Sequence, residues 1–235
     1  MTVGNTFEIL IPTFNGERYL ALCLLALSRS TTRDFSVRIG PEGTWKGGAE
    51  LEAFCERLAL PVVISQAHER IGLAANRARL LGESRSDYVL WLDDDVLVSP
   101  DSIAKLLSHS GTLGARNCLL TGVGSNLFGH PTVTCGLGFT LFRRDLLIGD
   151  PVLDHPFGIN TGEDCLWTAR IAYKSGLPVG FVPTQLHHIG ENRRRKRYGV
   201  HWDGSIVRLY TSAEFYDSNR EELDYSHPVY NYMDY

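Results

Sequence analysis

The sequence lacks the patterns that mark membrane-spanning, disulfide-rich and strongly basic proteins. It contains no uninterrupted apolar run of the roughly 18 residues that a membrane-spanning helix needs. Its five cysteines are scattered and never form a CxxC pair, which favours reduced, buried thiols over a disulfide framework or a zinc site. A net charge of −4 lacks the positive excess of nucleic-acid-binding proteins, so we expect no nucleic-acid partner.

The amino-terminal residues 1–6 lack the basic segment and the apolar stretch of a secretory signal peptide. Together with the cysteine pattern, this predicts a cytoplasmic protein. The chain has 235 residues, of which 43% are hydrophobic, and this suffices for one large α/β domain with an ordinary core.

Apolar strand patterns alternate with helical patterns along the first 110 residues. Buried strands are predicted at 7–12, 35–40, 61–64 and 87–92, and helices at 17–29, 49–60, 72–83 and 100–108. This alternation predicts an α/β fold with a Rossmann-like, doubly wound and mostly parallel sheet, in which ligands bind at the carboxyl ends of strands.

The second half of the sequence has weaker patterns and no internal repeat. Strands are predicted at 119–123, 133–142 and 178–182, and a helix at 163–175. We therefore expect one domain, 1–235, with a ligand-binding half at about 1–110, a looser half at about 111–210 and a polar tail at 211–235.

Three adjacent carboxylates, Asp93, Asp94 and Asp95, directly follow the strand predicted at 87–92. Unpaired acids are costly to bury, and a bound cation would offset their repulsion. Mg²⁺ and Mn²⁺ prefer such oxygen ligands, often together with substrate phosphates. Strand alternation would turn Asp93 and Asp95 to one side and Asp94 away. The alternative is a solvated acidic loop or the cap of the helix near Asp101.

Glu163 and Asp164 begin the helix predicted at 163–175, where acidic side chains complement the helix dipole. Helix capping alone would explain them. The functional alternative is that a carboxylate acts as a general base and removes a proton from a hydroxyl group.

His187 and His188 follow the strand predicted at 178–182, and an unbroken basic run covers 193–197. A neutral imidazole suits Mn²⁺ and similar ions, whereas the alternative is a packed or surface histidine. The basic run could grip a diphosphate or contact an anionic membrane surface, or it could be a solvated charged segment.

The order of these features resembles the family 2 glycosyltransferases of the GT-A fold, from about Phe7 to about Gly190. Residues 9–15 are similar to the family's first strand and its Pro-x-Tyr/Phe-Asn turn, which touches the nucleotide. Glu42 stands where the family has a base-contacting aspartate. Residues 71–76 are similar to the Gly-x-x-x-Ala-Arg-Asn segment, with its arginine missing at Ala75.

Three later motifs extend this resemblance. Residues 92–95 are similar to the metal-binding Asp-x-Asp of the family, and residues 162–164 to the pair whose aspartate is the catalytic base of inverting members. Residues 188–190 resemble the His-x-Gly that supplies a third metal ligand.

The resemblance implies a site for each part of the reaction. The residues it assigns to the nucleotide sugar are Pro12, Thr13, Phe14, Asn15, Glu42, Gly72, Asn76, Asp93 and Asp94. The residues it assigns to a metal are Asp93, Asp95 and His188, with His187 as the alternative to His188. Asp164 would be the base, and Glu163 would position the acceptor. The resemblance assigns no residue beyond Gly190, and the expectation that Arg193 and Arg194 steady the diphosphate comes from the basic run itself.

The implied activity is that of a metal-dependent, inverting hexosyltransferase with Mn²⁺ or Mg²⁺. It would move a sugar from a nucleotide-diphosphate sugar, usually of UDP, to a hydroxyl acceptor that the sequence does not identify. The first half would bind the nucleotide sugar, and the second half would hold the acceptor and the catalytic residues. A retaining transferase of the same fold and a nucleotide- or sugar-binding module without catalysis are the alternatives. A nucleotidyltransferase is disfavoured, because residues 12–15 stand where its Gly-rich loop would be.

Overall fold

The computed structural model describes the amino-terminal half almost completely and the carboxyl-terminal half in segments. The described residues are 7–14, 17–45, 47–112, 119–123, 138–146, 179–184, 186–188, 199–200 and 206–208.

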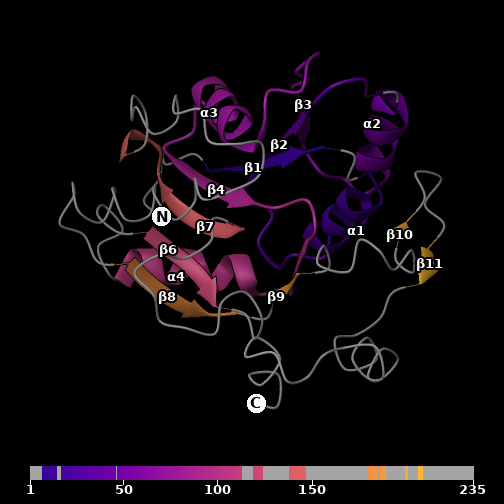
Figure 1. Ribbon diagram of the computed structural model, residues 1–235. Helices are drawn as coiled ribbons and strands as arrows, with labels where there is room; N and C mark the ends of the chain where they lie inside the picture. The colour runs from indigo at the N-terminus through magenta and orange to yellow at the C-terminus, as the bar shows by residue number, and fades with distance from the viewer. Residues whose placement is uncertain are drawn as a thin grey trace, which may run out of the picture.

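A seven-stranded mixed sheet runs through this part of the chain (Figure 1). Its spatial order is β3 (Val62–Ile64), β2 (Ser36–Pro41), β1 (Phe7–Thr13), β4 (Tyr88–Leu92), β7 (Phe139–Arg143), β6 (Leu119–Val123) and β8 (Val179–Pro183). The first four strands are parallel, and β7 is antiparallel to both of its neighbours, β4 and β6. β8 is parallel to β6. The expected α/β fold with a doubly wound, mostly parallel sheet is therefore confirmed.

β1 lies in the middle of the parallel part of the sheet, between β2 and β4. All seven of its residues are buried, which explains why Phe7–Thr13 is an almost continuous apolar run and not an alternating one. Phe7, Ile9 and Ile11 of β1 belong to a core that also includes residues of α1, β2, β4 and β7.

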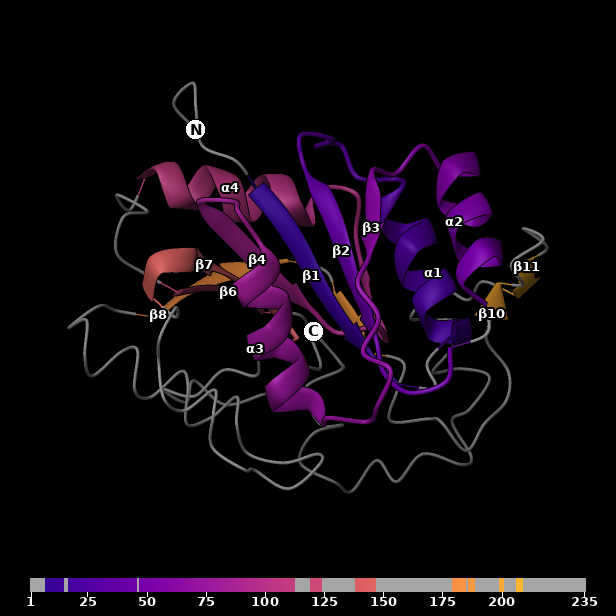
Figure 2. The same cartoon turned by 90° about the horizontal axis from the view of Figure 1, so that it is seen from above.

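In the described part of the chain, four helices connect and cover these strands, namely α1 (Glu17–Leu27), α2 (Gly48–Arg57), α3 (Leu73–Glu83) and α4 (Ser102–Thr112). α3 packs on β1 and β2, and Figure 2 shows it on the opposite side of the sheet from α4, which contacts β6 and β8. Helices on both faces are typical of a doubly wound sheet. Among the described residues, no helix combines the length and the apolar character needed to cross a bilayer.

The structure also contains short elements that the sequence analysis did not predict. β5 (Val96–Val98) pairs antiparallel with β9 (Leu186–His188), and β10 (Gly199–Val200) pairs antiparallel with β11 (Ile206–Arg208). A 3₁₀ turn, η2 (Arg144–Leu146), follows β7. The helix predicted at 163–175 lies outside the described residues, and the division of the domain near residues 110 and 210 stays a prediction.

Candidate functional site

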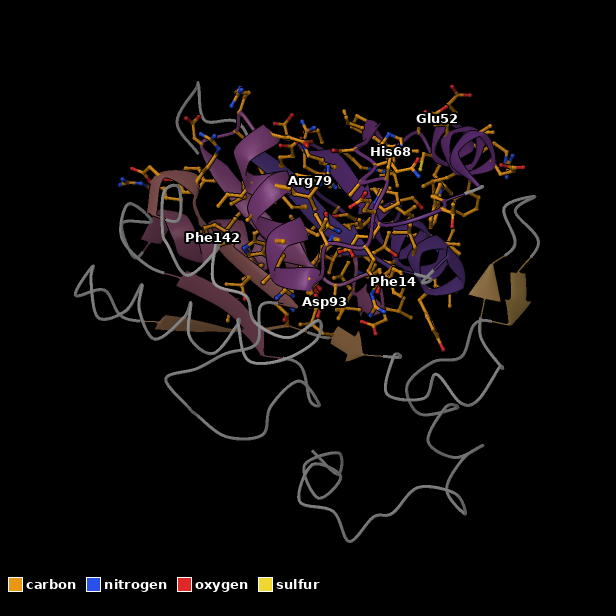
Figure 3. All side chains as sticks on the ribbon, turned by 45° about the horizontal axis from the view of Figure 1, so that its top comes forward. Phe14, Glu52, His68, Arg79, Asp93 and Phe142 are labelled. Carbon is orange, nitrogen blue, oxygen red and sulfur yellow. The ribbon has the colours of Figure 1, made fainter. Side chains whose placement is uncertain are left out.

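The carboxyl ends of β1, β2 and β4 meet at one edge of the sheet, where α3 also begins. These strands are adjacent and parallel, so Thr13, Pro41 and Leu92 end at the same edge. The backbone N–H of Glu42 donates to the carbonyl of Thr13 across 3.1 Å, which ties the first two strand ends together. Figure 3 labels Phe14, which follows β1, and Asp93, which follows β4. The expected ligand-binding edge is thus built from the predicted segments.

Asp93, Asp94 and Asp95 form a turn between β4 and β5, which we call the acidic turn. The strand ends at Leu92, so strand pleating does not extend to these three residues, and the expectation that Asp93 and Asp95 face one side and Asp94 the other stays a prediction. The N–H of Asp93 donates to the carbonyl of Gly138 across 3.0 Å. Asp94 and Asp95 are buried, and Asp93 is partly exposed.

Asp94 is fixed to the end of β1. Its Oδ2 accepts a hydrogen bond from Oγ1 of Thr13 across 2.5 Å, and both side chains are buried. Hydrogen bonds to an ionised acceptor are short and strong, so this contact sets the position of the acidic turn relative to β1.

Asp93 is fixed to α3. Its Oδ1 accepts from NH2 of Arg77 across 2.8 Å, and the Arg77 side chain is only 3% exposed, against 30% for Asp93. The guanidinium of Arg77 also lies 5.8 Å from the ring centroid of Trp91 in β4. Arg77 was not predicted as a site residue, because the motif's arginine was expected at Ala75. Counted from Gly72, the Gly-x-x-x-Ala-Arg-Asn pattern places this arginine at 77, so the signal was present.

The acidic turn lies beside the strand that carries the two predicted histidines. In the pairing of β5 with β9, Val96 faces His188 and Leu97 faces His187. The backbone of His188 is therefore next to the residue that follows Asp95. For both histidines the structure describes the backbone and not the side chain. Among the described side chains, no group of three or more acids, histidines or cysteines converges on a metal position. The carboxylate oxygens present nevertheless fit the ligand preference of Mn²⁺ or Mg²⁺.

The end of β2 is joined to the start of α3. Oε2 of the buried Glu42 accepts from the N–H of Gly72 across 3.0 Å, and Gly72 has a φ of 89°, which favours glycine. Nδ2 of the buried Asn76 donates to the carbonyl of Gly40 across 2.7 Å. A Cβ on Gly40 would lie 2.8 Å from Leu80, so glycine permits this close approach of α3 to β2.

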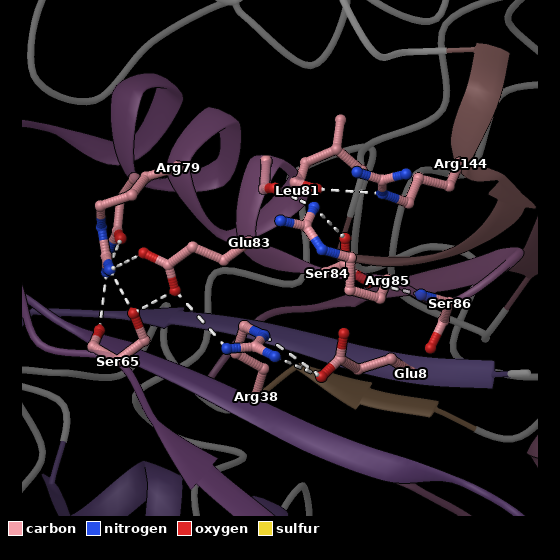
Figure 4. A network of polar contacts seen from close by, with 12 residues as sticks. Glu8, Arg38, Ser65, Arg79, Leu81, Glu83, Ser84, Arg85, Ser86 and Arg144 are labelled. Atoms are coloured by element: carbon pink, nitrogen blue, oxygen red, sulfur yellow. Dashed lines mark hydrogen bonds and ion pairs between the residues drawn. The ribbon is translucent and has the colours of Figure 1, made fainter.

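A polar network holds the rest of α3 on the sheet (Figure 4). Arg38 in β2 pairs with Glu8 of β1 at 3.1 Å and with Glu83 of α3 at 3.5 Å. Arg79 pairs with Glu83 at 3.0 Å and donates to Oδ1 of Asn76 across 2.8 Å. The network thus reaches Asn76 and fixes the orientation of its amide.

Cys23 of α1 lies behind the acidic turn, with its Sγ 3.8 Å from the carbonyl oxygen of Asp93. Burial raises the pKa of the Cys23 thiol well above its usual range, and the negative charges of Asp94, Asp95 and Asp93 raise this pKa further. Cys23 is therefore a neutral, packed thiol, as the scattered cysteine pattern predicts.

Several predicted site residues lie outside the described part of the chain. They are Asn15, Glu163, Asp164, Arg193 and Arg194. Of the remaining predicted residues, the structure brings Pro12, Thr13, Phe14, Glu42, Gly72, Asn76 and the acidic turn to the same edge of the sheet. The roles assigned to these residues stay predictions.

Part of the chain is similar in sequence to a bacterial protein. YfnE, an uncharacterized glycosyltransferase of Bacillus subtilis (strain 168), is 28% identical over 100 residues, which are 42% of this chain and 25% of YfnE. The chain therefore spans only about a quarter of the length of this relative.

Two solved structures share the fold at low sequence identity. The S. aureus TarS fragment 1–349 in complex with UDP-GlcNAc matches with a TM-score of 0.63 and 17% identity, over 94% of this chain and 69% of that chain. The mannosyltransferase PcManGT from Pyrobaculum calidifontis, in complex with GDP-Man and Mn²⁺, matches with a TM-score of 0.60 and 18% identity, over 77% of this chain and 56% of that chain. These likenesses establish the GT-A fold.

The sequence profile described as glycosyl transferase family 2 matches residues 8–126, which hold β1 to β4, α3 and the acidic turn. The matched region is half of the chain and includes every described contact of the acidic turn to β1 and α3. The chain belongs to glycosyl transferase family 2.

Proposed function

We propose that this protein is a glycosyltransferase that moves a sugar from a nucleoside-diphosphate sugar to a hydroxyl acceptor. The observation that carries this proposal is the placement of the acidic turn at the carboxyl end of β4, joined to the end of β1 by Thr13 and to α3 by Arg77. This edge is where doubly wound sheets bind ligands, and the family membership supports the same assignment.

A divalent cation, Mn²⁺ or Mg²⁺, is part of the proposed site. Asp95 and Asp93 would hold it together with His188, or with His187, and when bound it would neutralise charge on the departing diphosphate. The pairing of β5 with β9, which brings the backbone of His188 beside the acidic turn, supports this ligand set. The Mn²⁺ in the PcManGT structure supports the same class of metal.

The donor nucleotide is proposed to be UDP, which agrees with the UDP-GlcNAc bound to TarS. The GDP-Man in the PcManGT structure shows that the same fold also takes a purine nucleotide. Both complexes support a nucleoside-diphosphate sugar as the class of donor.

The proposed reaction inverts the anomeric centre, with Asp164 as the base that deprotonates the acceptor hydroxyl and Glu163 as the residue that positions it. Arg193 and Arg194 are proposed to steady the leaving diphosphate. The roles of Asp164 and Glu163 are supported by the sequence motif at 162–164, and those of Arg193 and Arg194 by the charge of the basic run. All four residues lie outside the described part of the chain. Inversion is tested by the anomeric configuration of the product, because a retaining enzyme would preserve the donor configuration.

A donor-hydrolysis screen tests the proposed function without knowledge of the acceptor. Purified protein is incubated with several nucleotide sugars and Mn²⁺, and released nucleoside diphosphate is measured. We expect release from at least one donor, and loss of that release in Asp95→Asn but not in Asp34→Asn. Asp34 is an exposed aspartate at the amino end of β2 and serves as the matched control. Equal rates in Asp95→Asn and wild type would contradict the proposal.

A further inference from the structure

A positive charge is held in a fixed position beside the acidic turn. The guanidinium of Arg77 in α3 donates to Oδ1 of Asp93 across 2.8 Å, and the Arg77 side chain is only 3% exposed. Its guanidinium carbon also lies 5.8 Å from the ring centroid of Trp91, which is fully buried in β4. A guanidinium in a protein stays protonated, so Arg77 carries this charge at every working pH.

Solvent screens this charge poorly, because the groups next to it are buried. Asp94 and Asp95, the next two residues of the acidic turn, are buried, and Cys23 packs behind the turn as a neutral thiol. Charges interact more strongly in such surroundings than on an open surface, where water and salt weaken them. The charge of Arg77 therefore affects the affinity of the acidic turn for any ion.

For a divalent cation this effect is unfavourable in two ways. Arg77 engages one carboxylate oxygen of Asp93, which a metal would otherwise use, and its charge repels the metal. A diphosphate has the opposite effect, because it brings negative charge and further oxygen ligands for Mn²⁺ or Mg²⁺. We therefore expect the acidic turn to bind a cation alone weakly and a cation with a diphosphate tightly.

We propose that Arg77 makes metal binding at the acidic turn depend on the diphosphate of the donor. This inference rests on the proposed function, because it takes the acidic turn as the metal site. Couplings between two ligands are reciprocal, so the same guanidinium makes nucleotide binding depend on the metal. Arg77 acts here through its charge and its contact with Asp93, and not as a ligand of the metal.

The first test measures the affinity of Mn²⁺ for nucleotide-free protein, from the electron paramagnetic resonance signal of the unbound ion. Arg77→Gln keeps an N–H donor for Asp93 and removes the charge, whereas Arg77→Lys keeps the charge. We expect Arg77→Gln to bind Mn²⁺ about tenfold more tightly than wild type, and Arg77→Lys to stay within about twofold of wild type. A purely structural role would weaken Mn²⁺ binding in both variants.

Arg38→Gln is the matched control. Arg38 forms an ion pair with Glu8 at 3.1 Å and is 16% exposed, so this variant also removes a charge from a largely buried ion pair. Glu8 is the second residue of β1, whereas the acidic turn is joined to Thr13, the last residue of that strand. Arg38→Gln should therefore leave the Mn²⁺ affinity unchanged.

A second test measures the affinity of UDP by calorimetry, once in excess Mn²⁺ and once in excess EDTA. The ratio of these two affinities reports how strongly the metal and the nucleotide depend on each other. In Arg77→Gln this ratio should fall by about tenfold relative to wild type, because the metal then binds well without the diphosphate.

Each test has results that would overturn the proposal. An Mn²⁺ affinity of Arg77→Gln equal to or below that of wild type would show that the charge does not oppose the metal. Equal gains in Arg77→Gln and Arg77→Lys would assign the effect to side-chain shape. If Arg77→Gln does not fold, wild type alone decides, because equal UDP affinities in Mn²⁺ and EDTA would exclude the coupling. Failure of the proposed function looks different: wild type would bind no nucleotide in either condition, and the nucleotide-free Mn²⁺ affinities would still decide the role of Arg77.

Discussion

Oγ1 of Thr13 donates a hydrogen bond to Oδ2 of Asp94 across 2.5 Å, with both side chains buried. This contact joins residues 81 positions apart in the chain and connects the end of β1 to the acidic turn. The middle aspartate of the cluster is therefore part of the support of the site.

Replacing Thr13 by Val should destabilise the fold, because the buried carboxylate of Asp94 loses a donor while the side-chain volume is kept. Removal of one partner of a buried hydrogen bond costs about 1–3 kcal/mol in the free energy of unfolding. Urea denaturation measures this cost. Thr13→Ser keeps the hydroxyl and should lose much less. Equal loss in the two variants would assign the effect to packing and not to the hydrogen bond.

The ion pair of Arg77 with Asp93 should respond unequally to loss of its two partners. Asp93→Asn leaves a buried guanidinium without its carboxylate, whereas Arg77→Met leaves a carboxylate that already contacts solvent. Removal of the carboxylate charge opposite a buried guanidinium is the more costly change, so Asp93→Asn should lose on the order of 2 kcal/mol more when unfolding free energies are compared. A larger loss in Arg77→Met would show that the packing of Arg77 on Trp91 dominates.

Two glycines of the α3–β2 region should respond in opposite directions to alanine. A Cβ at Gly40 would lie 2.8 Å from Leu80 and 2.9 Å from Asn76 Oδ1, so Gly40→Ala should cost roughly 1–3 kcal/mol through overpacking. Gly82 in α3 has no atom within 4 Å of such a Cβ, so Gly82→Ala should be neutral or stabilising by up to about 1 kcal/mol. Chemical denaturation of both variants measures these changes in the free energy of unfolding. A destabilised Gly82→Ala variant would contradict the prediction.

Cys55 should make the protein less stable at alkaline pH. Burial, with a smaller contribution from Glu52, raises the pKa of Cys55 to about 12 from an ordinary value of 9.0. Between these two values the unfolded thiol releases its proton and the folded thiol keeps it, so stability falls as the pH rises through this range. Cys55→Ala should show a shallower fall in urea midpoint above pH 9. Identical pH profiles for wild type and Cys55→Ala would contradict the raised pKa of Cys55.

The parallel half of the fold could be predicted because its signals are local. Residues 7–12 form a continuous apolar run, and residues 73–83 carry a helical pattern directly after Gly72, so β1 and α3 were found within a residue or two. β5 and β9 were missed because their pairing joins segments about ninety residues apart in the chain. Sequence periodicity does not report such long-range pairs.

The position of the site in the fold was predicted, but the contacts of its side chains were not. The acidic turn was placed correctly at the end of β4, because the carboxylates follow the strand directly. The partners of its side chains were not predicted, since Thr13 and Arg77 reach the aspartates only through the arrangement of β1 and α3 on the sheet. A hydroxyl inside an apolar strand gives no sequence signal of its buried acceptor.

The most direct test of the central claim is the affinity of UDP for wild-type protein and Asp95→Ala, measured by calorimetry with Mn²⁺ and again with excess EDTA. If the acidic turn holds a cation that binds the diphosphate, EDTA should weaken UDP binding to wild type by at least about tenfold, because charge neutralisation by a metal is worth several kcal/mol. Asp95→Ala should bind as weakly with Mn²⁺ as wild type does with EDTA, while Asp34→Ala should bind as wild type does. Tight UDP binding that neither EDTA nor Asp95→Ala changes would contradict the claim.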